Sequence, residues 1–304
     1  MIAATPALTA LGHTLETSPS AFGWLRSSED CLGQPARLRE RLEEDGYLYI
    51  RGFFDRDLVM AARASMTDRL QEKGLLHPDH PALSAIIAPG QKSRMQPELA
   101  QKNPRLERVA YGPELLGFYE QLRGGPIRHF DHTWVRAVGP GPGTHPHCDI
   151  VYMGRGTPDL LTCWIPYGDV PLELGGLIVL ENSHKKSDVL RPYLAKDVDS
   201  YCSNRPAEAA LAAEGKSSWP GWLSNNPASL REKLGGRWLT ADWRAGDFIT
   251  FKMSLVHGSL DNQTDQIRLS TDTRYQLAAE KIDERWVGPN PAGHGKAGKL
   301  GRIC

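Results

Sequence analysis

The sequence has no excess of charge of either sign. Its 304 residues include 36 Lys and Arg against 36 Asp and Glu, for a formal net charge of +0. Nucleic acids and anionic membranes recruit proteins through clustered positive charge, so this balance argues against both as partners. A small-molecule substrate is the better expectation, and no pattern in the sequence indicates a particular oligomeric state.

Cysteine is scarce and unpatterned. The five cysteines are odd in number, widely spaced and contain no Cys-x-x-Cys pair, which argues against a disulfide framework, a zinc cluster or a redox dithiol. We expect free thiols in a reducing compartment. The sequence also lacks an apolar run of membrane-spanning length, and its N-terminus lacks the basic leader and apolar stretch of a secretory signal. These absences predict a cytoplasmic protein.

The first third of the chain is predicted to be helical around one strand. Residues 38–45 have the pattern of a short amphipathic helix, and the aromatic and β-branched run at 46–51 favours a strand. Asp55 is a candidate N-cap for the helix that follows. A further helix is expected at 113–123, ended by Gly124.

From residue 126 onward the pattern changes to short β-like runs separated by Gly, Pro, Asn and Asp. Closely spaced short strands of this kind are typical of a sandwich or barrel of jelly-roll type. The fold class predicted is therefore mainly β with flanking helices. The expected strands are 132–138, 147–153, 160–167, 176–181, 236–242, 247–256 and 266–277.

Length and a hydrophobic content of 40% allow one large domain or two small ones, and we expect one domain over residues 1–304. Its parts would be a helical buttress at 1–125, a jelly-roll core at 126–280 and a tail at 281–304. The stretch 187–235 interrupts the rhythm of the strands, and we interpret it as an insertion that covers a site.

Two histidines and one aspartate are candidate metal ligands. His147 and Asp149 stand two apart, so on a strand they would share a face. His257 is expected at the end of the 247–256 strand. Each element alone is more often structural. Together they form a set of two imidazoles and one carboxylate, which leaves open positions on Fe(II).

Arg268 and Ser270 also stand two apart on a predicted strand, eleven residues after His257. The turn-rich loop between them is expected to fold the Arg268 strand back alongside the His257 strand. A guanidinium there would bind a dicarboxylate in bidentate fashion, and the Ser270 hydroxyl would add a hydrogen bond. The competing interpretation of Arg268 is a solvated strand cation.

The order of the motifs HCD, TCWIPYGDV, GGLIVLENSH, RAGDFITFKMSLVHGSLDNQT and IRLS resembles the phytanoyl-CoA dioxygenase family of 2-oxoglutarate-dependent oxygenases. Together with the early DGYLYIRGFFDRDLV, the likeness extends over about residues 38–277. It implies a double-stranded β-helix, a jelly roll related to the cupins. It also implies Fe(II), 2-oxoglutarate as cosubstrate and O₂, with ascorbate as an optional stimulant.

The same resemblance assigns roles to individual residues. His147, Asp149 and His257 match the iron ligands, while Arg268 and Ser270 match the clamp on the distal carboxylate of the cosubstrate. Three further residues are implied near the cosubstrate: Trp164, Thr162 and, where the family commonly has a different basic residue, Arg136.

The reaction implied is hydroxylation of an unactivated C–H bond, with release of succinate and CO₂. Related halogenases replace the carboxylate ligand by a small residue, and this chain keeps Asp149, so hydroxylation, desaturation or ring closure is favoured over halogenation. Two alternatives stay open from the residues alone. One is a cupin-like metalloenzyme that does not use 2-oxoglutarate, and the other is a non-catalytic binding protein on the same fold.

Other conspicuous side chains are expected to be structural or, in a few cases, to touch substrate. The cysteine between two ligands should face the core, and the tryptophans of the 187–235 region and its flank should anchor that segment. The residues concerned are His129, His132, His145, Cys148, Ser183, His184, Trp219, Trp222, Trp238, Arg274 and Tyr275.

Overall fold

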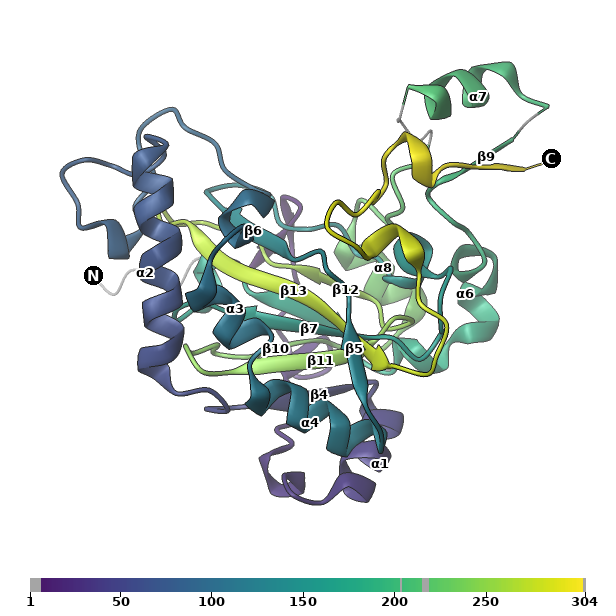
Figure 1. Cartoon of the computed structure of the whole chain (residues 1–304), viewed down its shortest axis with the longest axis horizontal. Coiled ribbons are helices and arrows are strands. Elements are labelled where there is room, and N and C mark those ends of the chain that lie inside the picture. The colour runs from purple at the N-terminus through teal and green to yellow at the C-terminus, as the bar shows by residue number, and fades with distance from the viewer. Residues whose placement is uncertain (1–6, 203, 215–218, 303–304) are drawn as a thin grey trace.

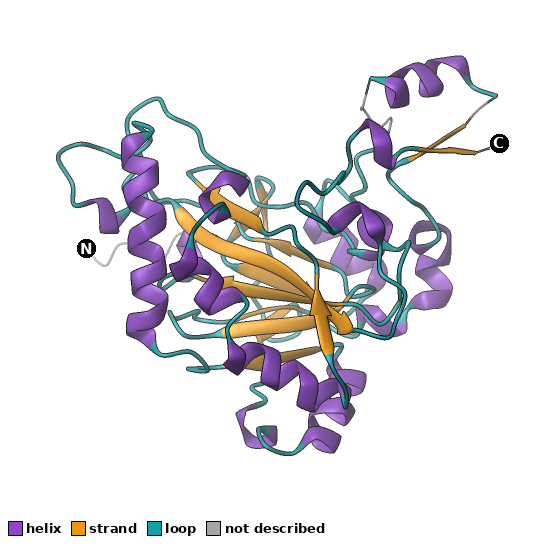
Figure 2. Cartoon of the chain, viewed as in Figure 1, coloured by secondary structure: helices purple, strands orange, loops and turns teal. Residues whose placement is uncertain are grey.

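Two β-sheets face each other in the centre of the molecule, and helices lie on their outer sides (Figures 1 and 2). The structure is a computed structural model that describes residues 7–202, 204–214 and 219–302. Within these ranges no helix combines the length and the apolarity needed to cross a bilayer.

The larger sheet has six strands, five of them in the order β4-β11-β7-β13-β5. The sixth, β6, pairs with the N-terminal half of β13, and β5 pairs with its C-terminal end. All its pairings are antiparallel. β13 is the longest strand and contacts three others, so it connects most of the sheet. The strands are β4 (Tyr47–Ile50), β5 (Ile127–His129), β6 (Trp134–Val138), β7 (Leu161–Pro166), β11 (Phe248–Lys252) and β13 (Arg268–Leu277).

The smaller sheet has the order β12-β8-β10-β3. Its strands pair antiparallel except for β10 and β3, which are parallel. Two such facing sheets form a jelly-roll core, which confirms the predicted fold class. The strands are β3 (Phe22–Trp24), β8 (Leu177–Leu180), β10 (Trp238–Thr240) and β12 (His257–Ser259), and a separate hairpin joins β1 (Thr9–Ala10) to β2 (His13–Thr14).

A core of large side chains fills the space between the sheets. Trp164 of β7 and Phe251 of β11 come from the larger sheet, and Val179 of β8 comes from the smaller one. Trp164 meets Trp243 edge to face, with 4.8 Å between ring centroids. Fully burying one such side chain stabilises the fold by about 1.5–3 kcal/mol, so this core sets the separation of the two sheets.

The first four helices cover the outer face of the larger sheet (Figure 1). Their apolar residues pack on the outward side chains of the sheet, among them Ile165, Leu269 and Tyr275. α1 and α4 each end at a left-handed glycine, Gly46 with φ 78° and Gly124 with φ 73°, a conformation that favours glycine. The helices are α1 (Pro35–Asp45), α2 (Arg56–Glu72), α3 (Pro104–Ala110) and α4 (Pro113–Arg123).

The segment 187–235 contributes to the core as well as to the surface. Leu190 and Tyr193 of α6 and Leu230 and Leu234 of α8 pack with the outward side chains of the smaller sheet. In Figure 1, α7 and the parallel pair of β9 and β14 stand apart from this body. The elements are α6 (Ser187–Leu194), β9 (Ser200–Cys202), α7 (Pro206–Ala213), α8 (Pro227–Leu234) and, from the tail, β14 (Leu300–Arg302).

Three details of the predicted strands are wrong. Residues 147–153 are not a strand, because Asp149 is in the right-handed helical region at φ −66°, ψ −24° and begins α5 (Ile150–Met153). The run 247–256 is interrupted after Lys252, where the chain crosses to the smaller sheet, and His257 begins β12. The Arg268 strand therefore lies in the opposite sheet from His257 and not alongside it. The residues before and after this crossing are both buried, so the hydrophobic pattern continues through it and does not show where the strand ends.

Asp55 caps α2 as predicted, since its carboxylate accepts a hydrogen bond from the Leu58 N–H at 3.0 Å. Replacing it by alanine should reduce the free energy of unfolding by about 1 kcal/mol, measured by urea denaturation. Asp68→Ala, at an exposed interior position of the same helix, is the control and should cause no comparable loss. Equal stabilities for the two variants would contradict the capping role.

Candidate metal centre

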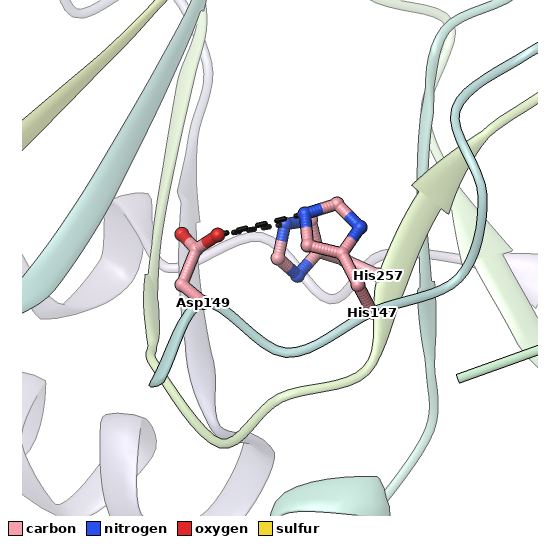
Figure 3. Close-up of side chains that lie close together, drawn as sticks. All are labelled: His147, Asp149 and His257. Carbon is pink, nitrogen blue, oxygen red and sulfur yellow. Dashed lines mark ion pairs between the residues drawn. The ribbon is translucent and has the colours of Figure 1, made fainter. Parts of the chain in front are cut away.

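Three side chains from two distant segments of the chain meet between the sheets (Figure 3). His147 and Asp149 flank the turn into α5, and His257 opens β12. One potential ligand atom from each lies within 4.8 Å of the other two. The Asp149 Oδ1 atom is 3.5 Å from His147 Nε2 and 3.7 Å from His257 Nε2. The structure thus brings together the three residues that the sequence proposed as ligands.

The backbone fixes the positions of both histidines. His147 N–H donates to the His257 carbonyl at 2.9 Å, and His257 N–H donates to the His147 carbonyl at 3.0 Å. This reciprocal pair forms an isolated antiparallel bridge. It holds the two imidazoles side by side, with 4.2 Å between ring centroids.

Each imidazole has one nitrogen engaged with the backbone. His147 Nδ1 lies 2.7 Å from the His145 carbonyl, and His257 Nδ1 lies 3.0 Å from the Leu255 carbonyl. A carbonyl accepts only an N–H, so in the neutral ring the Nε2 lone pair is left for a metal. Burial, followed by the proximity of His147, lowers the pKa of His257 to about 4, which keeps this ring neutral at pH 7.

Asp149 has one carboxylate oxygen held by the protein and one directed at the histidines. Its Oδ2 accepts a hydrogen bond from the Thr162 hydroxyl and another from Arg274 Nη2 at 2.9 Å. Burial alone would raise the pKa of Asp149, but Arg274 and the two histidines hold that pKa well below its usual range. The group is therefore an anion with Oδ1 available as a single ligand atom.

Arg274 is the functional residue that the sequence analysis missed. It was expected on the sheet face, as a structural residue or in contact with substrate, yet it is buried and paired with Asp149. Alternation along β13 carried the signal, because Arg268, Ser270, Asp272 and Arg274 are all at even positions on one face. Once Arg268 is assigned to the interior face of the strand, the other three residues must lie on that face as well.

Arg268 is buried with no carboxylate within ion-pair distance among the residues that the structure describes. It is 2% exposed, its Nη1 donates to Ser270 Oγ at 3.1 Å, and its Nε has no hydrogen-bond partner. Burial, then the positive charge of Arg136, lower the pKa of Arg268 to about 9, so the group stays charged at pH 7. An unpaired buried guanidinium is costly, so an anion in the adjoining cavity would stabilise it.

Two cavities meet at His147. The smaller one is bordered by Trp164, Arg268 and Asp272 as well as by His147 and His257. The larger one, of about 570 Å³, is bordered by His147 and Asp149. Arg136, whose Nε donates to Asp272 at 2.5 Å, borders both.

The remaining expected residues fall into two groups. Thr162 does not border the smaller cavity and has its hydroxyl on Asp149 instead, while His145 stacks on Trp222 at the larger cavity. Cys148 is buried in the core as expected, and the His184 Nε2 atom lies 3.1 Å from the Glu43 carbonyl. Cys31, Cys148 and Cys163 are free and buried.

The residues present fit a divalent metal with an oxo-diacid beside it. Two Nε2 lone pairs and one carboxylate oxygen on a single side leave the opposite coordination positions open, which is the arrangement of non-haem Fe(II) oxygenases. The unsatisfied Arg268 Nε in the adjoining cavity supplies a donor for a carboxylate. Fold and site together define a metal-dependent oxygenase of the double-stranded β-helix class.

Comparison with known proteins agrees with this class. The model of the family described as phytanoyl-CoA dioxygenase matches residues 42–270. Two curated relatives are 1-deoxypentalenic acid 11-beta-hydroxylases: that of Streptomyces exfoliatus is 27% identical over 248 residues, covering 78% of this chain and 79% of the relative. That of Streptomyces arenae is 26% identical over 250 residues with the same coverage.

Solved structures show the same fold. The non-haem α-ketoglutarate-dependent carbocyclase SnoK of nogalamycin biosynthesis aligns with a TM-score of 0.58 at 19% identity, over 85% of this chain and 89% of that one. The epimerase SnoN of the same biosynthesis aligns with a TM-score of 0.53 at 22% identity, over 86% and 87%. The chain belongs to the phytanoyl-CoA dioxygenase family and is a non-haem Fe(II)- and 2-oxoglutarate-dependent oxygenase.

Arg274→Gln should lower the affinity for Co(II), a spectroscopic substitute for Fe(II), by about 10- to 100-fold, the usual effect of removing a partner of a metal ligand. The reason is that the Asp149 carboxylate would no longer be fixed by the positive charge of the Arg274 guanidinium. The change is measured by absorption titration of the metal-free protein. Arg128→Gln, on β5 away from the site, is the matched control. An unchanged Co(II) affinity in the Arg274 variant would contradict the positioning role.

Proposed function

We propose that this chain hydroxylates an unactivated C–H bond of a small molecule, with His147, Asp149 and His257 as the iron ligands. Arg268 and Ser270 would bind the distal carboxylate of 2-oxoglutarate. The two hydroxylase relatives carry a small organic acid in their names, which supports a substrate of this size. The 187–235 segment and the tail are proposed to border the substrate, because Trp222 and His294 line the larger cavity.

The buried, uncompensated Arg268 is the observation that carries this proposal. Its guanidinium borders the same cavity as the two histidines, at the place where the far end of a metal-chelating oxo-diacid would lie. A cupin-like metalloenzyme that does not use an oxo-diacid has no need for a buried cation there. Trp164 would pack along the cosubstrate, and Arg136 would lie between cosubstrate and substrate.

The bound iron supplies activation of O₂, coupled to oxidative decarboxylation of the cosubstrate, and the protein supplies geometry. The bridge between His147 and His257 orients two neutral nitrogen ligands. Thr162 and Arg274 hold Asp149 Oδ2, so that only Oδ1 is offered. Burial of all three ligands limits access of water. Because Asp149 occupies the carboxylate position, no vacant place for a halide is left, which favours hydroxylation or a related desaturation or ring closure.

Removing the carboxylate ligand tests the metal assignment. Asp149→Ala should abolish iron retention and turnover, because a site with two neutral histidines alone binds Fe(II) weakly. Succinate formation with Fe(II), ascorbate and 2-oxoglutarate is the measurement. Since Asp149→Ala leaves Arg274 buried without its partner, Asp149→Asn is the second variant: it keeps the shape but loses the charge. Full activity in a folded Asp149→Asn protein would show the ligand assignment to be wrong.

Replacing the clamp tests the cosubstrate assignment. Arg268→Gln should weaken binding of 2-oxoglutarate by about 10- to 100-fold, because a charge-assisted hydrogen bond contributes about 1.5–3 kcal/mol. The binding is followed by the visible absorption band of the anaerobic Fe(II) complex with 2-oxoglutarate. The affinity of the Arg268→Gln variant for Co(II), measured without 2-oxoglutarate, should equal that of the wild-type protein. If wild-type protein gave no 2-oxoglutarate-dependent band, the oxygenase proposal itself would fail.

A further inference from the structure

The larger cavity has a buried end and an exposed end. His147 and Asp149, both buried, line its inner part, whereas Arg94, an exposed residue, lines it where it reaches solvent. Its volume of about 570 Å³ is within the range of ordinary small-molecule sites. A ligand that spans the cavity therefore contacts Arg94 at one end and approaches the metal ligands at the other.

The charges along this cavity do not cancel. Arg274 is paired with Asp149 at 2.9 Å and Arg136 with Asp272 at 2.5 Å. Arg94 has no carboxylate within ion-pair distance among the described residues, and its Nη2 donates to the Pro142 carbonyl at 2.7 Å. Asp149, the acid among the described residues that border the cavity, already has its arginine. One positive charge at the mouth is thus left uncompensated.

Arg94 is held in place by the backbone around it. The Ala137 N–H donates to the Arg94 carbonyl at 2.6 Å, and the Gly139 N–H donates to the Ser93 carbonyl at 3.0 Å. The Gln96 N–H donates to the Val135 carbonyl at 2.9 Å. These bonds attach residues 93–96 to the edge of β6 like an additional strand, so the Arg94 side chain starts from a fixed point on the cavity wall.

The walls between the two ends are aromatic. Trp222 stacks on His145 with 3.9 Å between ring centroids and 11° between planes, and Trp134 lies 4.6 Å from the Arg274 guanidinium carbon. Tyr152 also lines the cavity, and its hydroxyl donates to the Pro220 carbonyl at 2.9 Å.

We propose that the substrate is a carboxylic acid with a compact apolar body, whose carboxylate pairs with Arg94 at the mouth. The body would lie between Trp134, Tyr152 and Trp222 and present a C–H bond remote from the acid to the metal end. A guanidinium favours a carboxylate through two parallel charge-assisted hydrogen bonds. This substrate class rests on the proposed function for the reaction, although the binding it describes does not require turnover.

The test uses ligands that differ only in the charged group. Decalin-2-carboxylic acid, its methyl ester and decalin-2-amine share one frame, and 2-naphthoic acid, its methyl ester and 2-naphthylamine share a second. Each is titrated calorimetrically into the full chain loaded with Co(II) and 2-oxoglutarate, which does not turn over. On at least one frame the acid should bind about 10-fold or more tightly than the ester and the amine, the value of a charge-assisted hydrogen bond of about 1.5 kcal/mol.

Variants assign the preference to one residue. Arg94→Gln should make acid and ester bind equally, and Arg94→Glu should reverse the order in favour of the amine, which loss of structure would not do. Trp222→Leu should weaken acid and ester together. Arg105→Gln, an exposed arginine on α3, changes the net charge equally outside the cavity and should leave the acid preference intact.

The outcomes separate this inference from the proposed function. Absence of an acid preference on both frames, or a preference that survives Arg94→Gln, overturns the substrate class. If the acid preference depends on Arg94 but the iron-loaded protein forms no succinate from 2-oxoglutarate, the proposed function fails and the substrate class stands. If the iron-loaded protein forms succinate but shows no acid preference, the proposed function stands and the substrate class fails.

Discussion

The site depends on one pair of backbone hydrogen bonds, those exchanged by His147 and His257. The two residues are distant in the chain, and neither is within a long strand at that point. Backbone pairing brings their imidazoles side by side, and the neighbouring carbonyls turn each Nε2 to the same side. The ligands are therefore preorganised, because a network already satisfied by the protein holds their donor atoms in place.

Electrostatic balance accounts for the rest of the site. β13 contributes alternating charges to the interior, with Arg274 compensated by Asp149 and Asp272 compensated by Arg136. Arg268 on the same face has no such partner among the described residues, and neither does Arg94 at the mouth of the larger cavity. Paired charges hold geometry, whereas unpaired ones attract ligands, so the two unpaired arginines mark the ends at which anions are expected.

The sequence predicted well whatever depends on local periodicity. The helix at 113–123, the cap at Asp55 and the expected short strands other than 147–153 appear in the structure, and they follow from alternation and capping chemistry. The combination of His147, Asp149 and His257 was also recognisable. The sequence did not reveal the chain crossing after Lys252 or the turn at Asp149. The polarity of the residues there depends on contacts with distant parts of the chain, so it does not mark the end of a strand. Arg274 was missed although its alternation with Arg268 was visible.

The way the smaller sheet is covered has a consequence for how such enzymes diversify. The helices of segment 187–235 close its outer face with Leu190 and Leu234, while the same segment supplies Trp222 to the cavity. Exchanging this whole segment between relatives would replace the side chains that cover that face of the sheet along with the one that lines the cavity, so stability and substrate range would change together. Single replacements on the strip at 93–96, which carries little of the core, offer the less restricted route.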